Sequence, residues 1–366
     1  MGCGSVGERH YLPDLAASPH VELAAVCDTD EARAARAARA ARVARRYGVP
    51  RWYTDVDAML AGSEFELLCN LTPMPFHASL ALKALRAGRH VLNEKPLATS
   101  LREADALLEE AARRGLIVTA APNAVLSPTF HAAAAAISSG EIGTACAARG
   151  RYGHAGPHEP WFYQQGSGAL FDLGVYNVVT LTGLLGPAVG VVALSGGVVP
   201  SRQLHGEEFA VEADDNTTLL LDFGRGVQAV IQTGFVYPTR PDGGAAYDDR
   251  VTIEVLGTQG AINWLGYDWE PRGIEVRTAA SPDWETRAAH QQGYTWKNGG
   301  SSLARCLATG EHSAMSAAHA YHTLEVMLGA LESARSGRRI EIRSTFPAPA
   351  QTQTREKEGE GQEVMQ

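Results

Sequence analysis

Strands and helices alternate through the first third of the chain, and this alternation limits the possible folds more than any other feature. Apolar runs that predict strands are separated by helix-like stretches, two of which close at Gly88 and Gly115. The predicted strands are 21–28, 65–71, 90–93 and 116–121, and the predicted helices are 29–47, 78–87 and 101–114. Helices between successive strands indicate βαβ units and therefore a parallel sheet.

The pattern changes after about residue 122, where strands begin to follow one another directly. Glycine-rich turns separate the runs TTLLLDF, GVQAVIQTGFVY and DRVTIEVLG, which favours an antiparallel sheet. The other elements predicted here are helices at 127–138, 166–186 and 314–336 and a strand at 145–152. We therefore expect one domain at 1–122 and a second at 123–346, and we expect the Pro-, Gln- and Glu-rich tail at 347–366 to be disordered.

Composition excludes several classes of protein. A formal net charge of −9 over 366 residues argues against a general nucleic-acid or acidic-membrane binder. No apolar run is long enough to span a bilayer, and the first residues do not form a secretory signal. The five cysteines are scattered without CxxC spacing, so we interpret them as reduced structural thiols of a cytoplasmic protein.

The segment GCGSVG matches the dinucleotide-binding pattern G-x-G-x-x-G. Its glycines permit a tight turn and a close approach of the backbone to a pyrophosphate at a helix N-terminus. Asp28 follows at a strand end, where a carboxylate can bind a ribose 2′-hydroxyl and repels a 2′-phosphate. The expected cofactor is therefore NAD, with NADP less favoured. The residues predicted to contact it in this loop are Gly2, Gly4, Ser5, Val6 and Gly7.

The glycine loop should follow a strand, yet only Met1 precedes Gly2. That strand would lie in the middle of the sheet, and its neighbours would lose backbone partners without it. We expect the working protein to carry about six to ten more apolar residues ahead of Met1.

A lysine at the carboxyl end of a buried strand points to a functional site. Lys95 follows the apolar run at 90–93, and an unpaired buried ammonium is costly. Ligands bind at the carboxyl ends of strands in open α/β sheets. Farther along, Asp172 and Tyr176 are four residues apart and would share one face of a helix. An amine, a carboxylate and a phenol can together move a proton on a hydroxyl group.

The order GCGSVG, VCDTD, TPMPFHASLALKALRAGRHVLNEKPLA and GALFDLGVY resembles the glucose–fructose oxidoreductase and inositol dehydrogenase family (Gfo/Idh/MocA). The resemblance implies an α/β fold with an N-terminal Rossmann domain, whose first strand is here apparently missing or truncated. It also implies a C-terminal α+β domain with an open, mostly antiparallel sheet, which often makes homo-oligomer contacts. The implied activity is NAD(P)-dependent oxidation or reduction at a hydroxyl or carbonyl carbon of a sugar, polyol or related compound.

The family motifs can be matched to this chain residue by residue. The stretch beside the cofactor matches Thr72, Pro73 and His77, and the pair near the nicotinamide matches Glu94 and Lys95. Asp172 matches the family's carboxylate.

Tyr176 stands where many members have histidine, which resembles the subgroup in which tyrosine is the acid/base. Because a free tyrosine has a pKa of about 10, it needs a nearby cation to act as a base at neutral pH. Lys95 is the expected cation.

Plainer interpretations remain for each of these residues. Lys95 can form a structural ion pair with Glu94 or Asp172, Tyr176 can be a core aromatic residue, and Asp172 can cap its helix. His77 is better explained as a packing or helix-start residue than as a catalyst.

Substrate contacts are expected from Asn123, His154 and Trp161, whose segments could line a pocket. We expect no metal site, since His154 and His158 are separated by glycine and proline that prevent a regular helix. Two other functions stay open: an NAD-dependent glycosidase on the same fold, and a dinucleotide-binding sensor without turnover.

Overall fold

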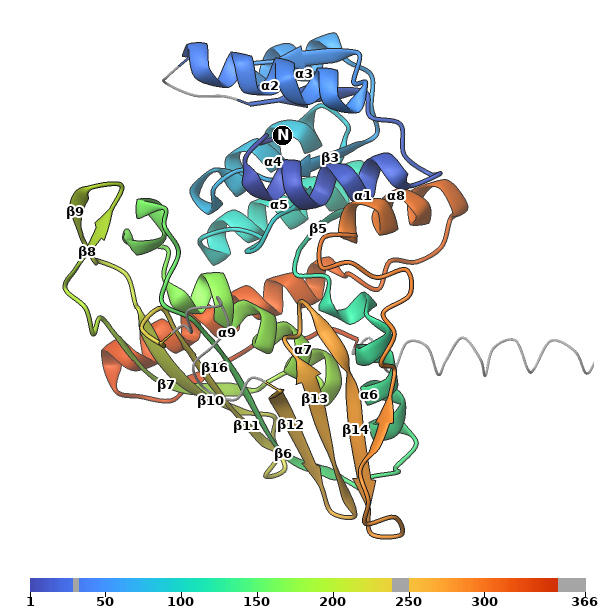
Figure 1. Cartoon of the computed structure of the whole chain (residues 1–366), viewed down its shortest axis with the longest axis vertical. Helices are drawn as coiled ribbons and strands as arrows, with labels where there is room; N and C mark the ends of the chain where they lie inside the picture. The colour runs from blue at the N-terminus through green and yellow to red at the C-terminus, as the bar shows by residue number, and fades with distance from the viewer. Residues whose placement is uncertain (29–32, 239–249, 348–366) are drawn as a thin grey trace, which may run out of the picture. The chain divides into compact units, whose positions relative to one another are not determined.

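The computed structural model describes residues 1–28, 33–238 and 250–347, without the side chains of 33–38. The chain divides into two compact units (Figure 1). Unit 1 comprises Met1–Asn123 and Thr295–Leu324, and unit 2 comprises Ala124–Tyr294 and Glu325–Gln366. The sequence pattern predicts that 295–324 belong to the second domain. These residues join unit 1 because helix α8 packs on α1 and β4, contacts that no local pattern announces.

Unit 1 has the expected alternation of strands and helices. Its strands are β1 (Ala25–Cys27), β2 (Arg51–Tyr53), β3 (Leu67–Asn70), β4 (His90–Asn93) and β5 (Val118–Ala120). Its helices are η1 (Gly7–Tyr11), α1 (Leu12–Ala17), α2 (Arg33–Tyr47), α3 (Val56–Gly62), η2 (Met74–Phe76), α4 (His77–Arg86), α5 (Leu101–Arg114) and α8 (Gly299–Thr309). The sheet order β3-β4-β5 is parallel, as is the pair β1-β2, which confirms the predicted parallel architecture.

Helix α5 shows why local sequence predicted its bounds. Ser100 caps the helix by accepting from the Glu103 backbone N–H at 3.3 Å, and Glu103 reaches back to the Thr99 N–H at 3.1 Å. The Ser100 side chain thus satisfies one donor that a helix start leaves unpaired, and Glu103 ties the residue before the cap to the first turn. The helix ends at Gly115, whose φ of 66° is the left-handed conformation that glycine adopts without strain.

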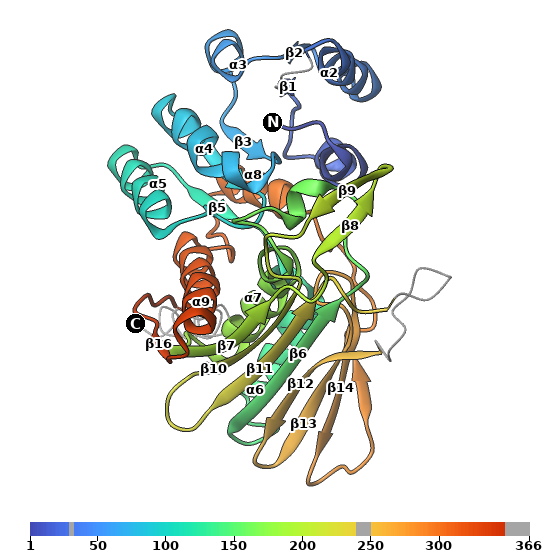
Figure 2. The same ribbon diagram turned by 90° about the vertical axis from the view of Figure 1, so that its left-hand side faces the viewer.

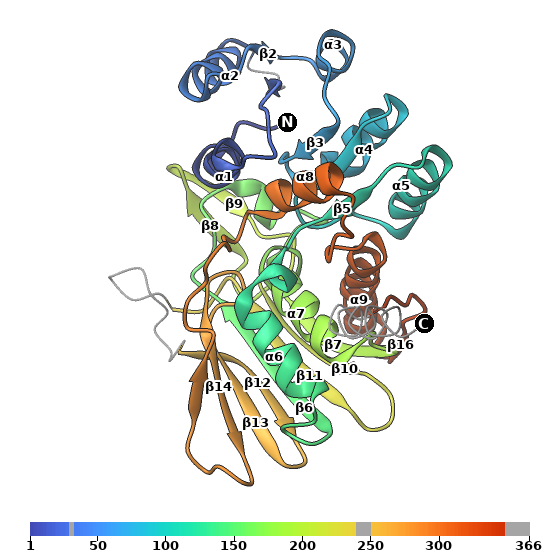
Figure 3. The same cartoon turned by 90° about the vertical axis from the view of Figure 1, so that its right-hand side faces the viewer.

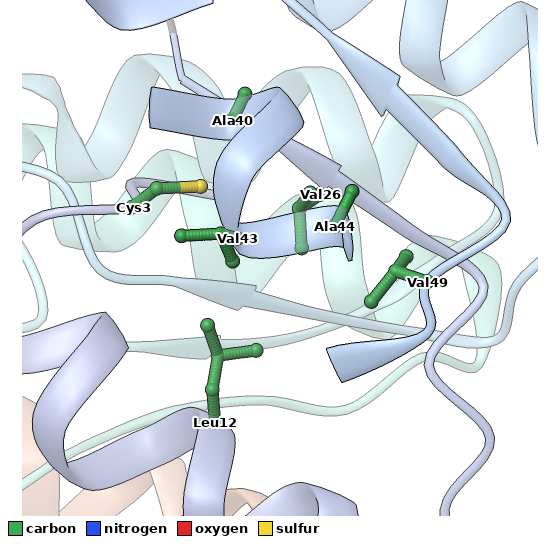
Figure 4. Close-up of a cluster of buried hydrophobic side chains, with 7 residues drawn as sticks. All are labelled: Cys3, Leu12, Val26, Ala40, Val43, Ala44 and Val49. Atoms are coloured by element: carbon green, nitrogen blue, oxygen red, sulfur yellow. The ribbon is translucent and has the colours of Figure 1, made fainter. Parts of the chain in front are cut away.

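The first part of unit 1 has its own small core, in which one face of α2 covers β1 (Figure 4). Ala40, Val43 and Ala44 share a face at helical spacing and pack with Val26 of β1. The remaining members of this cluster are Cys3, Leu12 and Val49. Residues 29–32, the predicted start of this helix, lie outside the described residues.

The sheet of unit 1 is divided between β1 and β3, the place where the glycine loop should follow a strand. Met1 bridges the two sides at one end: its amino group donates to Cys69 O at 3.0 Å and its carbonyl accepts from Leu71 N at 2.8 Å. Gly2 N donates to Cys27 O at 2.8 Å. Beyond this bridge lies a cavity of about 370 Å³, lined by residues 21–26 and 64–69 and by helix α8. The predicted strand 21–28 is accordingly shortened to β1.

Unit 2 is built on one nine-stranded sheet of order β15-β14-β13-β12-β6-β11-β10-β7-β16 (Figure 2). All neighbouring pairs are antiparallel except β6 and β11, so the expected open, mostly antiparallel sheet is confirmed. The strands are β6 (Ala145–Gly153), β7 (Gly190–Gly196), β10 (Asn216–Asp222), β11 (Gln228–Gly234), β12 (Val251–Gly257), β13 (Gly260–Gly266), β14 (Pro271–Thr278), β15 (Glu285–Arg287) and β16 (Ile340–Glu341). A separate hairpin contains β8 (Ser201–Leu204) and β9 (Glu207–Ala210).

Helices cover one face of this sheet (Figure 3). They are α6 (Pro128–Ser138), α7 (Val175–Leu185) and the part of α9 (Ala317–Ser336) that belongs to unit 2. The shorter helices of unit 2 are η3 (Ala124–Leu126), η4 (Pro160–Tyr163) and η5 (Leu170–Gly174). The helix predicted over 166–186 starts later because Gly168 has a φ of 108°. The described part of the chain has no helix long and apolar enough to cross a membrane. The predicted disordered tail lies almost wholly outside the described residues.

Candidate active site

In the glycine loop of unit 1, Gly2 and Gly7 have no room for a side chain, whereas Gly4 faces open space. A Cβ on Gly2 would meet Leu71 O at 2.7 Å, and one on Gly7 would meet Gly2 O at 2.6 Å. A Cβ on Gly4 would meet no atom within 4 Å. Ser5 and Val6 begin the helix that follows. The loop therefore fits a ligand that approaches Gly4 at a helix N-terminus, which is the arrangement that dinucleotide phosphates need.

Asp28 directly follows β1 and is the last described residue before the gap at 29–32. It is buried, and its carboxylate lies 3.6 Å from the guanidinium of Arg39 on α2. Its backbone N–H donates to Tyr53 O at 3.1 Å, which fixes the end of β1 against β2. The carboxylate is thus held at the strand end, where the sequence predicted a ribose-binding acid.

Two buried asparagines join the carboxyl ends of β3 and β4. Asn70 and Asn93 are paired in register, and the Asn70 amide donates to Asn93 Oδ1 at 3.0 Å. Thr72 Oγ donates to Asn70 Oδ1 at 2.7 Å, and the Asn93 amide donates to Leu97 O at 2.9 Å. This chain of hydrogen bonds links the loop after β3 to the loop that carries Lys95.

His77 occupies the space between the same two loops. Its ring nitrogens lie 2.7 Å from Pro96 O and 2.7 Å from Thr72 O, and the side chain is buried at the start of α4. Burial lowers the pKa of His77, although both carbonyl contacts oppose this shift. The His77 ring therefore holds the loop after β3 and the loop after β4 together. Pro73 lies between Thr72 and η2 in the first of these loops.

Glu94 is buried beside Lys95 and has strong partners of its own. Its carboxylate accepts from the Tyr11 hydroxyl at 2.9 Å and forms an ion pair with Lys297. Lys297 and Lys95 lower the pKa of Glu94 to about 2, against the opposing effect of burial. Lys95 itself is half-buried, and its backbone N–H donates to Glu94 Oε2 at 3.2 Å.

Asp172 and Tyr176 lie on one continuous helical run in unit 2, as predicted. Asp172 is in the π-helical turn η5, and Tyr176 follows in the first turn of α7. Asp214 caps this run: its carboxylate accepts from the Leu170 N–H at 3.0 Å, and a Cβ on Gly168 would collide with it. π-Helical turns occur often at functional sites.

An aromatic cluster lies beside Tyr176 and meets it through Tyr152. The Tyr152 ring on β6 lies 6.0 Å from the Tyr176 ring and 4.7 Å from that of Tyr267. Trp269 stacks on Tyr267 at 5.7 Å. Burial raises the pKa of Tyr152 well above its ordinary value, and the charge of Asp172 adds to this effect. Both effects favour the neutral form of the Tyr152 hydroxyl.

Of the three residues expected to contact substrate, Asn123 lies in unit 1, whereas His154 and Trp161 in unit 2 are linked by ring contacts through Phe235 and Phe162. The Asn123 amide donates to Thr295 O at 3.1 Å and to Asn298 Oδ1 at 2.6 Å, so it fixes the segment before α8. In unit 2, His154 stacks on Phe235 at 5.8 Å, and its Nδ1 accepts from the Gly156 N–H. Trp161 stacks on Phe162, with ring centroids 3.7 Å apart.

The predicted residues thus form two groups. Unit 1 holds the glycine loop, Asp28 and the loop of Glu94 and Lys95, and unit 2 holds Asp172 and Tyr176. The described residues contain no cluster of three or more His, Cys, Asp or Glu side chains suited to a metal ion.

Comparison with known families identifies both parts of the chain. A model described as an oxidoreductase family with an NAD-binding Rossmann fold matches residues 1–121, and a model of the GFO/IDH/MocA C-terminal domain matches residues 130–263. The chain belongs to the Gfo/Idh/MocA family. The resemblance found in the sequence motifs is thereby confirmed, and so is the expected class of enzyme, an oxidoreductase.

Relatives of this Gfo/Idh/MocA protein include named dehydrogenases. The levoglucosan dehydrogenase of Pseudarthrobacter phenanthrenivorans is 27% identical over 273 residues, covering 69% of this chain and 67% of the relative. The scyllo-inositol 2-dehydrogenase (NAD(+)) of Bacillus subtilis is 23% identical over 350 residues, covering 93% and 95%. The crystal structure of GenD2 from gentamicin A biosynthesis in complex with NAD has a TM-score of 0.73 at 27% identity, covering 94% and 95%.

Several residues of the site were not found from sequence. Asn70 and Asn93 each end an apolar strand, in LLCN and HVLN, and this repeated pattern is a signal that could have been used. Tyr11 and Lys297 gave no such signal, since each lies far in sequence from the glutamate that it contacts.

Proposed function

We propose that this Gfo/Idh/MocA protein transfers a hydride between a nicotinamide dinucleotide and a hydroxyl-bearing carbon of a sugar, polyol or related compound. The observation that carries the proposal is the pairing of Asp172 and Tyr176 on one helical run, with Tyr152 beside them. These are groups that hold and move a hydroxyl proton, in a chain whose other unit has an NAD-binding fold.

The residues of unit 1 fit the cofactor. Gly4 leaves room for the pyrophosphate, Ser5 and Val6 begin the helix that faces it, and Asp28 holds a ribose hydroxyl. Thr72, Pro73 and His77 hold the strand-end loops along its path. We propose NAD over NADP because the buried Asp28 carboxylate opposes a 2′-phosphate, although Arg39 reduces that repulsion. The bound nicotinamide supplies hydride transfer.

In the oxidation direction, Tyr176 accepts the proton of the substrate hydroxyl while the hydride leaves the same carbon. Lys95 stabilises the negative charge that develops on that oxygen and favours the ionised phenol. Asp172 holds a neighbouring hydroxyl of the substrate. Tyr152, Tyr267 and Trp269 offer aromatic faces and hydroxyl or indole donors, a combination suited to a carbohydrate ring. His154 and Trp161 are further candidates for that contact.

The test begins with fluorescence titrations of the protein with NADH and NADPH, followed by a screen of polyols and sugars for NADH production. We expect tighter binding of NADH and turnover of at least one polyol. Tyr176→Phe should lower kcat by about 10²–10⁴-fold with an unchanged NADH Kd. Tyr53→Phe, which loses a phenol bonded to Ser63, is the matched control and should leave kcat unchanged.

A Tyr176→Phe enzyme with full activity would remove tyrosine from the mechanism. Release of an aglycone from a glycoside without net NADH production would instead indicate the glycosidase reaction.

We also propose a homo-oligomer that forms through the uncovered face of the sheet in unit 2. Exposed apolar side chains lie side by side there on β7, β10 and β11, where Leu220 is in register with Val192 and Val230. Leu194 on β7 and Leu256 on β12 extend the patch. Contiguous apolar surface of this kind marks protein contacts.

A further inference from the structure

The ion pair between Lys297 and Glu94 is the most deeply buried one described for this chain. The two residues are 203 positions apart, and their side chains are only 2% and 9% exposed. The pair of Lys83 with Asp57 lies at the surface, and in the pair of Arg39 with Asp28 only the carboxylate is buried. Two charges are rarely removed from water together, because desolvation opposes their attraction. A net gain in stability therefore does not by itself explain why this ion pair is buried.

Lys297 is held in place by aromatic rings. Its ammonium lies 4.3 Å from the centre of the Trp296 ring and 5.5 Å from that of Tyr11. The Trp296 indole in turn donates to His10 Nδ1 at 3.2 Å. Ring faces attract a desolvated cation. The ammonium is therefore held between the Tyr11 ring of η1 and the Trp296 ring of its own loop.

Glu94 transmits that position to Lys95. One of its carboxylate oxygens, Oε1, accepts from both Lys297 and the Tyr11 hydroxyl. The other, Oε2, accepts from the backbone N–H of Lys95 at 3.2 Å. The orientation of one carboxylate therefore connects the Lys297 ammonium with the backbone from which the Lys95 side chain extends.

We propose that Lys297 is a positioning residue: it fixes the Glu94 carboxylate and, through it, the backbone of Lys95. This inference rests on the proposed function, in which the Lys95 ammonium must meet the substrate oxygen. Small displacements of such a group reduce catalysis strongly, since a shift of about 1 Å can cost on the order of 10²-fold.

The charge of Glu94 provides a readout that is specific to this role. The groups facing Glu94 are Lys297, Lys95, Tyr11 and, more weakly, the rings of His77 and His10. Lys297 is the largest of the influences that lower the pKa of Glu94, while burial raises it. Without Lys297, only Lys95 and Tyr11 would oppose the effect of burial, so the pKa of Glu94 should rise.

The experiment compares pH profiles of kcat/KM for the wild-type enzyme, Lys297→Met and Lys297→Arg with the same substrate and NAD. Lys297→Met should lower kcat by about 10–100-fold and move the acid limb of the profile to higher pH. Lys297→Arg keeps the cation and should restore most of the rate and the wild-type limb. Lys83→Met removes a lysine from the surface pair with Asp57 and is the matched control, which should change neither quantity.

A Glu94→Gln/Lys297→Met double variant separates the role of charge from that of folding. It removes the unpaired buried carboxylate, so it should fold even if Lys297→Met does not, and it should lack the shifted acid limb. The proposal is overturned if Lys297→Met loses thermal stability but keeps the wild-type kcat. It is also overturned if the double variant loses thermal stability but keeps the wild-type kcat. A Lys95→Met enzyme with full activity would reject the proposed function instead, whatever Lys297 does.

Discussion

At the residue scale, buried polar groups fix the elements that carry the proposed chemistry. Asp268 is fully buried in unit 2, where its carboxylate accepts from the Asn177 amide at 2.9 Å and from Thr180 at 3.2 Å. Both partners lie on α7, shortly after Tyr176. Asp268 Oδ1, Asn177 Oδ1 and the Tyr294 hydroxyl have no hydrogen-bond partner among the described residues. The helix is therefore anchored by an acid that is incompletely satisfied.

Asp268→Asn should stabilise the protein at neutral and higher pH. Burial raises the pKa of Asp268 to about 7 from an ordinary value of 3.8, so the folded state binds the proton more tightly than the unfolded state. Wild-type stability therefore falls as pH rises from about 4 to 7, whereas asparagine stays neutral and can also donate to Asn177. The difference in unfolding free energy should change across that window by about 4 kcal/mol, in the direction that favours the variant.

Urea unfolding at a series of pH values measures this difference. Thr180→Val, which removes one donor to Asp268 and leaves the carboxyl in place, is the comparison variant. A difference between Asp268→Asn and wild type that does not change with pH would contradict the assigned ionisation.

At the scale of elements, the sheet of unit 1 is divided between β1 and β3. We call the space between these two strands the slot, and the bonds of Met1 define the direction of a strand that would fill it. Met1 bonds to both sides of Asn70 as a residue of a parallel strand does, through Cys69 O and Leu71 N. Backbone edges of β1 and β3 border the cavity beyond it, together with apolar side chains such as Leu23 and Leu68. A strand in this slot would pair with β1 and β3 at once.

An engineered strand of about six β-branched residues joined ahead of Met1 should raise Tm. Pairing both edges and filling the cavity would stabilise unit 1, and each 1 kcal/mol corresponds to roughly 2–4 °C in a protein of this size. We expect a rise of at least about 4 °C by calorimetry. The same extension with prolines at alternate positions cannot donate to the edges and is the control. Equal Tm values for the two extensions would show that the slot does not accept a strand.

At the scale of the whole molecule, the sheet face of unit 2 that the helices leave exposed is the surface through which we propose assembly. Leu194 is 79% exposed and lies on the same face as Val230, with helices covering the other side of the sheet. The fold has no internal partner for this patch among the described residues, so a second copy is the proposed cover.

Leu194→Glu combined with Val230→Glu should convert the oligomer to monomers. Each carboxylate would be buried without a partner in the interface, which is strongly unfavourable. Light scattering after size-exclusion chromatography gives the mass directly. Ile117→Glu places the same charge on an exposed apolar residue of unit 1 and should leave the mass unchanged. A wild-type protein that is already monomeric would remove the proposed interface.

The sequence by itself determined the alternating elements, the glycine loop, the strand-end position of Lys95 and the shared helical run of Asp172 and Tyr176. These features follow from local physics: side-chain periodicity, capping as in α5, and glycine conformations at turns. Only the tertiary structure decided that Lys297 pairs with Glu94, that Asp214 caps the helix of Asp172, and that 295–324 belong with unit 1. Such contacts join residues far apart in sequence, and their energies depend on burial and on partners that no local pattern specifies.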